Sequence, residues 1–222
     1  KKKSIVGNPM NLSYIGNEDG KVYVSSSANA MEWTEAQQQS NAWNVGYHLL
    51  NLQSFNKRFY AAYGDLQIGP HKGNIFLSYC ENKKDWITPY QPASNWRTEY
   101  PITLHSFNNK LYLAHIGVSP KGTIYLSSSE DGRNWLPPYQ PAANWRTEHP
   151  IALHSFNNRL HLAYVGAAPK GMIYLSSSAD GRNWTPAQQP NTTWRTEHSV
   201  SLQSFNNRLY LGYVGRELKG II

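Results

Sequence analysis

A four-residue segment, Trp-Arg-Thr-Glu, carries the side chains of this sequence that are best suited to ligand chemistry. It occurs at residues 96–99, 145–148 and 194–197, and a histidine follows the last two copies. The face of an indole can cover the C–H side of a sugar ring, arginine donates hydrogen bonds in a fixed fork, and glutamate accepts them from hydroxyl groups. Because surface loops have little need of identical packing residues, the repetition predicts repeated binding sites.

Two lysines are expected to join these sites. Lys121 and Lys170 lie in Pro-Lys-Gly turns, which the order of the expected strands places at the same edge as the Trp-Arg-Thr-Glu segments. Arginine and lysine together would add a preference for a carboxylate or sulfate group on the ligand. The candidate ligand-binding residues are therefore Trp96, Arg97, Glu99, Trp145, Arg146, Glu148, His149, Trp194, Arg195, Glu197, His198, Lys121 and Lys170.

A structural interpretation of the same segment is also open. The tryptophan can wedge between neighbouring units of the fold, and the arginine can pair with the glutamate to stiffen the chain. The first corresponding segment, residues 43–47, keeps a tryptophan but lacks the arginine and the glutamate. If the motif is a binding site, that copy should be inactive or altered, which makes it an internal control.

These segments belong to a repeat that runs through the whole chain. Ser-Phe-Asn followed by alternating apolar residues marks each copy, and the markers lie 49, 52, 49 and 49 residues apart. A period of this length with short strands is typical of β-propeller blades. The markers are Val6 in a divergent first copy, then Phe55, Phe107, Phe156 and Phe205. A single domain over residues 1–222 is predicted, with repeats at 1–46, 47–98, 99–147, 148–196 and, incomplete, 197–222.

Each repeat reads as four consecutive strands. In the fourth repeat, residues 150–156, 160–165 and 172–177 alternate as strands do, and a short fourth strand is expected at 184–189. No segment has a helical period. The predicted class is therefore all-β, a β-propeller of five blades whose last blade is incomplete. Its inner strands are expected at residues 2–6, 48–55, 102–107, 151–156 and 200–205.

Composition limits the classes of function. Lysine and arginine number 21 against 14 aspartates and glutamates, which favours anionic partners without choosing among them. The one cysteine, Cys80, excludes an internal disulfide and a cysteine-based zinc site. The histidines lack the spacing of metal ligands, and no cofactor or metal is predicted. The sequence has no apolar run of membrane-spanning length, no signal peptide and no dense basic stripe for nucleic acid, and its tryptophan-rich repeats suit a secreted or extracellular protein.

A second motif, Ser-x-Asp-Gly-x-x-Trp, lies within residues 128–135 and 177–184. Two earlier repeats keep its tryptophan, at Trp33 and Trp86, and lose the Asp-Gly pair. The motif resembles a shortened Asp-box of the sialidase-type propellers, and with the repeat around it the resemblance covers nearly the whole chain. In those families the box lies on the face away from the active site. The resemblance therefore implies that Asp131 and Asp180 hold a turn and are not catalysts.

Near-identity among the repeats favours binding over catalysis. Residues 106–154 and 155–203 agree at most of their positions, whereas an active centre needs different residues converging on one point. Several equal weak sites would give avidity on a glycan surface. We therefore expect a multivalent, lectin-like propeller that binds glycans at the links between blades, favours acidic glycans, completes its ring by self-association and is not an enzyme. The alternatives are a sialidase-like glycoside hydrolase and a protein-interaction or structural module of a larger secreted protein.

Overall fold

A computed structural model describes residues 10–15, 22–29, 31–38, 50–65, 72–81 and 85–215 of the chain. Within these ranges the regular structure consists of β-strands alone, which confirms the all-β prediction. The described ranges contain no helix long and apolar enough to cross a membrane. The strands are β1 (Met10–Ile15), β2 (Val22–Ser27), β3 (Gln37–Gln38), β4 (Asn51–Phe55), β5 (Arg58–Gly64), β6 (Ile75–Cys80), β7 (Thr103–Phe107), β8 (Lys110–Val118), β9 (Lys121–Ser129), β10 (Ala152–Phe156), β11 (Arg159–Val165), β12 (Ile173–Ser178), β13 (Ser201–Phe205) and β14 (Arg208–Gly212).

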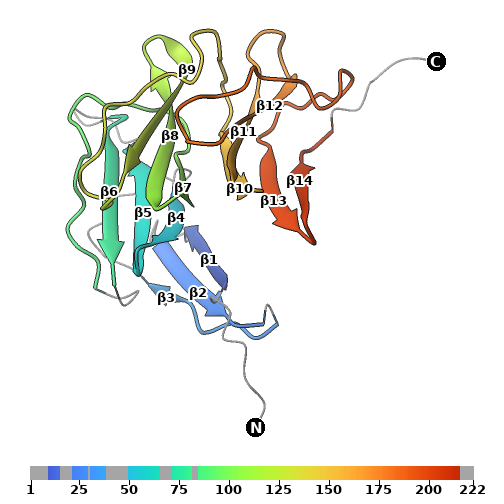
Figure 1. Cartoon of the computed structure of the whole chain (residues 1–222). Coiled ribbons are helices and arrows are strands. Elements are labelled where there is room, and N and C mark those ends of the chain that lie inside the picture. Colours follow the sequence, from blue (N-terminus) through green and yellow to red (C-terminus); the bar gives the residue numbers. More distant parts are fainter. Residues whose placement is uncertain are drawn as a thin grey trace.

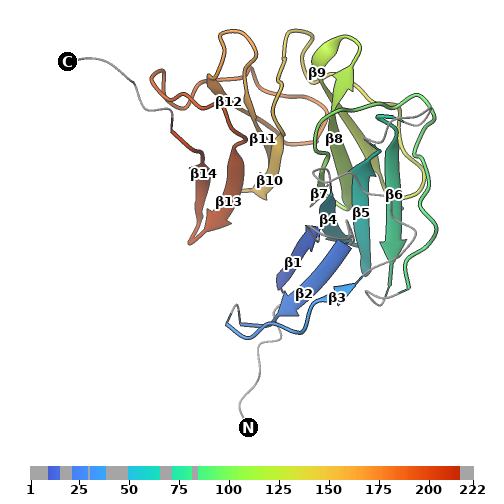
Figure 2. The same ribbon diagram turned by 180° about the vertical axis from the view of Figure 1, so that it is seen from behind.

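The strands form five small antiparallel sheets that stand side by side in an open arc (Figures 1 and 2). The first four sheets have three strands each, in chain order, and the last consists of β13 and β14. Strands β4, β7, β10 and β13 each lie at one edge of their sheet, and each contacts the next along the inner side of the arc. They are the inner strands predicted from residue 48 onward. The inner strand predicted at residues 2–6 lies outside the described residues.

Tight hairpins join each of these inner strands to the next strand of its sheet. Asn108 and Asn109 adopt φ angles of 45° and 55°, and the same left-handed pair recurs at residues 56–57, 157–158 and 206–207. Asparagine is the residue other than glycine that accepts this conformation most readily. The turn fixes the register of the hairpin and thereby decides which side chains face the next sheet.

The fourth strand expected in each repeat is reduced to a single bridge in the second and third sheets and to two isolated bridges, Leu175 with Gln188 and Ser178 with Trp184, in the fourth. Leu126 pairs with Tyr139, and Leu175 with Gln188, through backbone hydrogen bonds of 2.8 and 2.9 Å in each case. Pro138 immediately precedes Tyr139, and proline has no N–H to extend a ladder. In the first sheet the same position forms the two-residue strand β3. The sequence therefore overestimates the length of the outermost strand.

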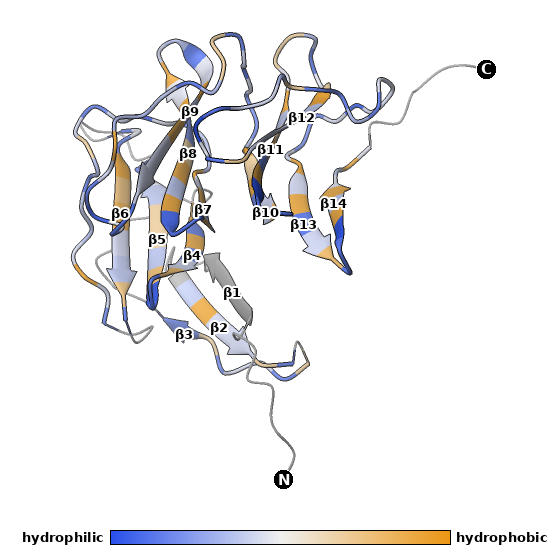
Figure 3. Ribbon diagram, in the orientation of Figure 1, coloured by the Kyte–Doolittle hydropathy of each residue, from blue (hydrophilic) through white to orange (hydrophobic). Residues whose placement is uncertain are grey.

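Apolar side chains fill the space between neighbouring sheets. Tyr112 and Ile116 of the third sheet pack with Leu153 and Leu160 of the fourth in one buried cluster. Figure 3 shows the apolar residues concentrated in strands such as β6 and β8, between more hydrophilic connections. Because both faces of an inner sheet are covered in this way, each sheet depends on its neighbours for burial.

The Asp-Gly turns are held by their aspartates. The backbone N–H groups of Asn134 and Arg133 both donate to Asp131 Oδ1 at 2.8 Å, and they hold the pKa of this carboxyl well below its usual range. In the first sheet Asn29 accepts two equivalent backbone bonds of 2.9 Å, so loss of the aspartate does not remove the turn. These bonds support the structural role expected for Asp131.

Replacing Asp180 by alanine is expected to lower the free energy of unfolding by about 1–2 kcal/mol, because the N–H groups of Arg182 and Asn183 lose their acceptor. Asp180→Asn should cost less, since Asn29 holds the corresponding turn with two such bonds. Urea unfolding of the three proteins measures both differences. Equal losses for the alanine and asparagine variants would show that the negative charge, and not the pair of bonds, holds the turn.

Candidate functional site

The predicted site residues gather along one edge of the arc, which we call the rim: residues 95–100, 117–122, 144–149, 166–171 and 193–198. Backbone hydrogen bonds join each link between sheets to the turn between the second and third strands. Thr147 N–H donates to the carbonyl of Gly122 at 2.9 Å, and Thr196 N–H to that of Gly171 at 3.0 Å. Gly122 has a φ of 81°, and a Cβ there would lie 3.0 Å from the Thr147 carbonyl oxygen. The glycine of the Pro-Lys-Gly turn thus allows the link to lie against it.

Acidic and basic side chains alternate along the rim. Lys121 Nζ lies 3.2 Å from Glu148 Oε1, and Lys72 Nζ lies 3.8 Å from Glu99 Oε1. The hydrogen bond with Glu148 raises the pKa of Lys121, and the charge of Glu99 adds to that shift. Lys121 is therefore within electrostatic reach of carboxylates from two successive links.

The histidine of the second link extends this row of charges. Desolvation lowers the pKa of His149, and the charges of Lys170 and His198 lower it further. Glu148 and Glu197 act in the opposite direction. Four predicted residues, Glu148, Lys170, Glu197 and His198, thus lie within electrostatic range of His149.

The tryptophans of the motif lie between the sheets. Trp96 and Trp145 are only 4% and 5% exposed. Trp96 stacks on His115 at 5.7 Å between ring centroids, and Trp145 stacks on Tyr164 at 5.5 Å. Trp194 is half-buried against Tyr213 of the last sheet. This packing is the wedge of the structural interpretation, and a direct role of these indoles in ligand binding stays a prediction.

The arginines of the motif donate to their own links. One guanidinium nitrogen of Arg146 donates to the carbonyls of Ala143 and Trp145, both at 2.9 Å. Arg97 and Arg195 make the corresponding pairs of bonds. The arginine thus braces the bend before it, while the rim pairs that involve Glu99 and Glu148 are made with lysine. The sequence showed the repeated arginine but not which group it would meet.

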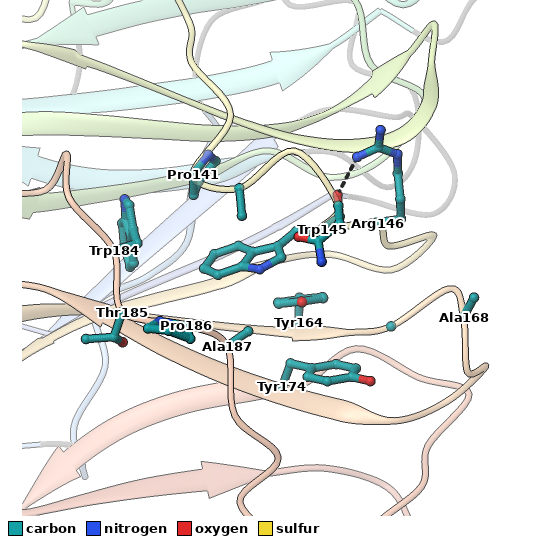
Figure 4. A pocket seen from close by; sticks show the side chains of 13 residues that line it. Pro141, Trp145, Arg146, Tyr164, Ala168, Tyr174, Trp184, Thr185, Pro186 and Ala187 are labelled. Carbon is teal, nitrogen blue, oxygen red and sulfur yellow. Dashed lines mark hydrogen bonds between the residues drawn. The ribbon is translucent and has the colours of Figure 1, made fainter.

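A pocket of about 500 Å³ lies beside Trp145, between the link and the fourth sheet (Figure 4). Its walls include Tyr164, Tyr174, Trp184 and Pro186. An equivalent, smaller pocket lies one sheet earlier, beside Trp96 and His115. Arg146 Nη1 is engaged by the link and points away from the centre of the larger pocket, as Figure 4 shows. Aromatic side chains line part of both pockets, and neither pocket has a carboxylate among its lining residues.

Hydrogen bonds connect neighbouring inner strands near the middle of each strand. Ser155 N–H donates to His105 Nε2 at 2.9 Å, and His154 Nε2 lies 2.9 Å from Ser204 Oγ. Gln53 takes the corresponding position in β4 and donates to Ser106 Oγ at 3.3 Å. Burial lowers the pKa of His105 to about 4, so this ring is a neutral acceptor. Sequence analysis did not identify the partner of these histidines, the serine of the Ser-Phe-Asn marker.

No group of three or more His, Cys, Asp or Glu side chains that could hold a metal ion occurs in the described part of the chain.

Comparison with known proteins shows the fold. No protein-family model and no curated protein matches this sequence, whereas many solved structures do. The α-L-arabinanase of Penicillium chrysogenum, solved with arabinobiose, matches with a TM-score of 0.63 at 14% identity, over 87% of this chain and 67% of the arabinanase chain. The xyloglucan PUL protein GH43B of Bacteroides ovatus matches with a TM-score of 0.62 at 13% identity, over 93% and 46% of the two chains. The intramolecular trans-sialidase of Ruminococcus gnavus, in complex with oseltamivir carboxylate, matches with a TM-score of 0.61 at 11% identity. The match covers 82% of this chain and 43% of the trans-sialidase chain.

These matches establish the architecture at the level of the fold. The matched proteins are β-propellers, so the predicted propeller class is confirmed. Sequence identities of 11–14% show a shared fold and nothing more specific. Membership of the Asp-box family is therefore not shown. The chain spans about two thirds of the arabinanase and less than half of the other two.

The comparisons correct the functional prediction. The arabinanase and the trans-sialidase are enzymes, and this overturns the expectation of a lectin-like propeller without catalytic activity. The prediction took repetition as a sign of repeated ligand sites. In the structure the repeated Trp and Arg serve the packing and bracing of successive sheets, a need that recurs once per repeat in any propeller. The described residues give no support to self-association.

Proposed function

We propose that this chain is the catalytic propeller of a glycoside hydrolase and that hydrolysis takes place at the rim. Support comes from the fold shared with carbohydrate-acting enzymes and, within this chain, from Glu99 and Glu148, the two carboxylates that act on Lys121. Glycosidases commonly cleave between a pair of carboxyl groups. This pair is the observation that carries the proposal, because both carboxylates act on one lysine, and the described inner strands contain no acidic side chain.

Both carboxylates lie where inner strands begin. Glu99 precedes β7 by four residues, and Glu148 precedes β10 by four. Strands β7 and β10 are neighbours on the inner side of the arc, so the two glutamates belong to links that lead into adjacent inner strands. Their side chains are 51% and 50% exposed, so a substrate can reach them from solvent.

A lysine lies beside each of the two carboxylates, Lys121 at 3.2 Å from Glu148 and Lys72 at 3.8 Å from Glu99, and the proposal assigns them different roles. Glu148 accepts the hydrogen bond of Lys121 and in our proposal acts as the ionised group, either attacking the anomeric carbon or activating the water that does so. Glu99 in its protonated form donates its proton to the glycosidic oxygen, which leaves as a hydroxyl group. Lys121 pairs with Glu148, and the charge of Glu99 has a smaller effect on the same lysine.

We also propose the finer organisation of the chain. The five sheets are consecutive blades of a repeat that is about 49 residues long, with boundaries as the sequence places them, and the protein works outside the cell, where polysaccharide substrates are found. The regular spacing of the hairpins at residues 56–57, 108–109, 157–158 and 206–207 supports this division.

The expected result is release of sugar from at least one member of a substrate panel, with loss of about 100-fold or more in Glu148→Gln and Glu99→Gln. The panel consists of 4-nitrophenyl glycosides of arabinofuranose, xylose and galactose, with arabinan, sucrose and sialyllactose. Glu130→Gln is the matched control, because it removes an ion pair of the same 3.2 Å length, to Lys110, at the opposite edge of the arc. Absence of hydrolysis over the whole panel, or equal activity in all three variants, would contradict the proposal.

A further inference from the structure

Two pockets lie beside the links that carry the proposed catalytic carboxylates. The pocket next to Trp96 has a volume of about 340 Å³, and the pocket next to Trp145 has a volume of about 500 Å³. Both volumes fall in the range of small-molecule sites in proteins, about 300–1,000 Å³. The proposed reaction takes place at the exposed carboxylates of the rim and gives neither pocket a role.

Each pocket shares its link with one of the two carboxylates. Arg97 lines the smaller pocket and precedes Glu99 by two residues, and Arg146 stands in the same relation to Glu148 in the larger pocket. The links run from the outer part of one sheet to the inner strand of the next. Along its link, each pocket therefore comes just before the carboxylate.

Backbone contacts hold the two sides of each pocket together. A bridge joins Thr98 of the link to Gly117 of the turn in the third sheet. In the fourth sheet Ala167 N–H donates to the Arg146 carbonyl at 3.0 Å. Because link and turn are joined in this way, each pocket keeps its place beside the carboxylate of its link.

A half-buried tyrosine lies in the wall of each pocket, Tyr125 in the smaller and Tyr174 in the larger. Gln140 Nε2 donates to Tyr125 Oη at 3.4 Å, and Gln189 Nε2 donates to Tyr174 Oη at 3.2 Å. Each phenol keeps its own hydrogen to donate, and each amide oxygen is an acceptor. The same polar pair is therefore present at both pockets.

This combination suits a sugar residue. An aromatic ring covers the C–H face of a sugar, while tyrosine and glutamine can exchange hydrogen bonds with its hydroxyl groups. In the larger pocket Trp145, Tyr164 and Tyr174 form one stack, with centroid distances of 5.5 and 5.2 Å, and Pro186 lies beside it (Figure 4). The pocket thus offers both apolar and hydrogen-bonding surface.

We propose that the two pockets are substrate-binding subsites, which hold sugar residues on opposite sides of the bond that is cleaved between Glu99 and Glu148. The inference rests on the proposed function and narrows its substrate to oligosaccharides and polysaccharides. The pocket on the Glu99 link holds the leaving-group side, because Glu99 gives its proton to the glycosidic oxygen. The pocket on the Glu148 link holds the side that keeps the anomeric carbon. Binding of these residues then contributes to kcat as well as to affinity.

The second sheet supplies a matched substitution. Phe76 pairs with Tyr63 in the register in which Tyr125 and Tyr174 pair with their own neighbours, and the two rings stack at 5.6 Å between centroids. Tyr125→Phe and Tyr174→Phe therefore remove one hydroxyl group each and leave a side chain that the fold already accepts. Tyr210→Phe is the control, because it removes an exposed hydroxyl group outside the rim.

The first test measures binding to the Glu148→Gln chain by NMR titration with disaccharides and hexasaccharides of arabinose, xylose and galactose. We expect at least one hexasaccharide to shift the signals of Tyr125, Tyr174 and their neighbours, and to bind about tenfold or more tightly than its disaccharide. Each pocket Tyr→Phe variant should weaken this binding about fivefold, and the control should not. No shift near either tyrosine with any hexasaccharide in the millimolar range, or equal affinity for short and long chains, would overturn the proposal.

The second test separates this inference from the proposed function. With Glu148 restored, kcat/KM should be at least about tenfold higher for the hexasaccharide than for the disaccharide, and Tyr174→Phe should reduce that ratio. Hydrolysis that is equally efficient for both chain lengths would contradict the subsites and leave the hydrolase intact. Binding at both tyrosines without hydrolysis of any substrate would contradict the proposed function, and with it the role of the pockets as subsites.

Discussion

Gly181→Ala is expected to destabilise the protein by about 3 kcal/mol or more, one of the largest losses open to a single methyl group in this fold. Two costs add at this position. The backbone has a φ of 73°, where an alanine is strained, and the new Cβ overlaps the Tyr112 ring across the contact between the third and fourth sheets. Relief requires the sheets to move apart, which exposes a cluster that includes Leu160 and Leu162.

Two further variants separate these costs. Gly181→Asn keeps the overlap with Tyr112 but relieves part of the backbone strain, because asparagine accepts positive φ better than alanine does. Gly215→Ala is the control for a glycine without either constraint, since its Cβ would meet only Tyr213, at 3.9 Å. Chemical unfolding should rank the control as nearly unchanged and both Gly181 variants well below it. A Gly181→Ala protein as stable as the control would show that the tyrosine and the turn are not in contact in solution.

Residue pattern alone was sufficient to predict the all-β class and the inner strands from residue 48 onward. Alternation marks a strand, and a pair such as Asn108 and Asn109 marks a left-handed turn, because both are local properties of the chain. The outermost strand was predicted too long, since the proline-rich segment keeps only the bridge at Tyr139 and one further backbone hydrogen bond, from Leu136 N–H to the Ser128 carbonyl. The residue pattern does not show whether packing against the neighbouring sheet can compensate for the hydrogen bond that a proline cannot donate.

The site was harder to predict, because repetition has two physical causes that look alike in a sequence. Trp145 could recur to meet a ligand or to meet Tyr164 of the next sheet, and only the three-dimensional neighbour decides between them. The same applies to Arg146, which braces carbonyls of its own link. Glu148 differs, because its partner Lys121 belongs to another segment and its side chain stays half exposed. Exposure combined with repetition is therefore a better criterion for chemistry than repetition alone.

Acidification from pH 7 to pH 4 is expected to remove several kcal/mol of stability through two buried histidines. Burial lowers the pKa of His115 and of His105 to about 4. His115 lies between Trp96 and Tyr125, and its Nδ1 has no hydrogen-bond partner among the described residues. A histidine whose pKa is lowered by folding favours the unfolded state when protonated. Its contribution is therefore complete above pH 6.5 and is lost as the pH falls toward 4, by ~3 kcal/mol for each ring.

The repeats themselves supply the matched replacements. Tyr164 occupies the position of His115 in the next sheet, and Gln53 occupies the position of His105 in the preceding one, so His115→Tyr and His105→Gln place in each site a side chain that the fold already accepts. Urea unfolding measured from pH 7 to pH 4 should show a steep loss of stability in the wild type and a much shallower one in the double variant.

The loss of stability that remains in the double variant comes from His149, His154 and His161, whose pKa values are also lowered by burial. The aspartates of the turns, with depressed pKa values, lose their contribution only at lower pH, so they do not obscure this window. If stability depended on pH equally steeply in the double variant, neither ring would be buried as a neutral group. The hydrogen bond from Ser155 N–H to His105 Nε2 would then not form in solution.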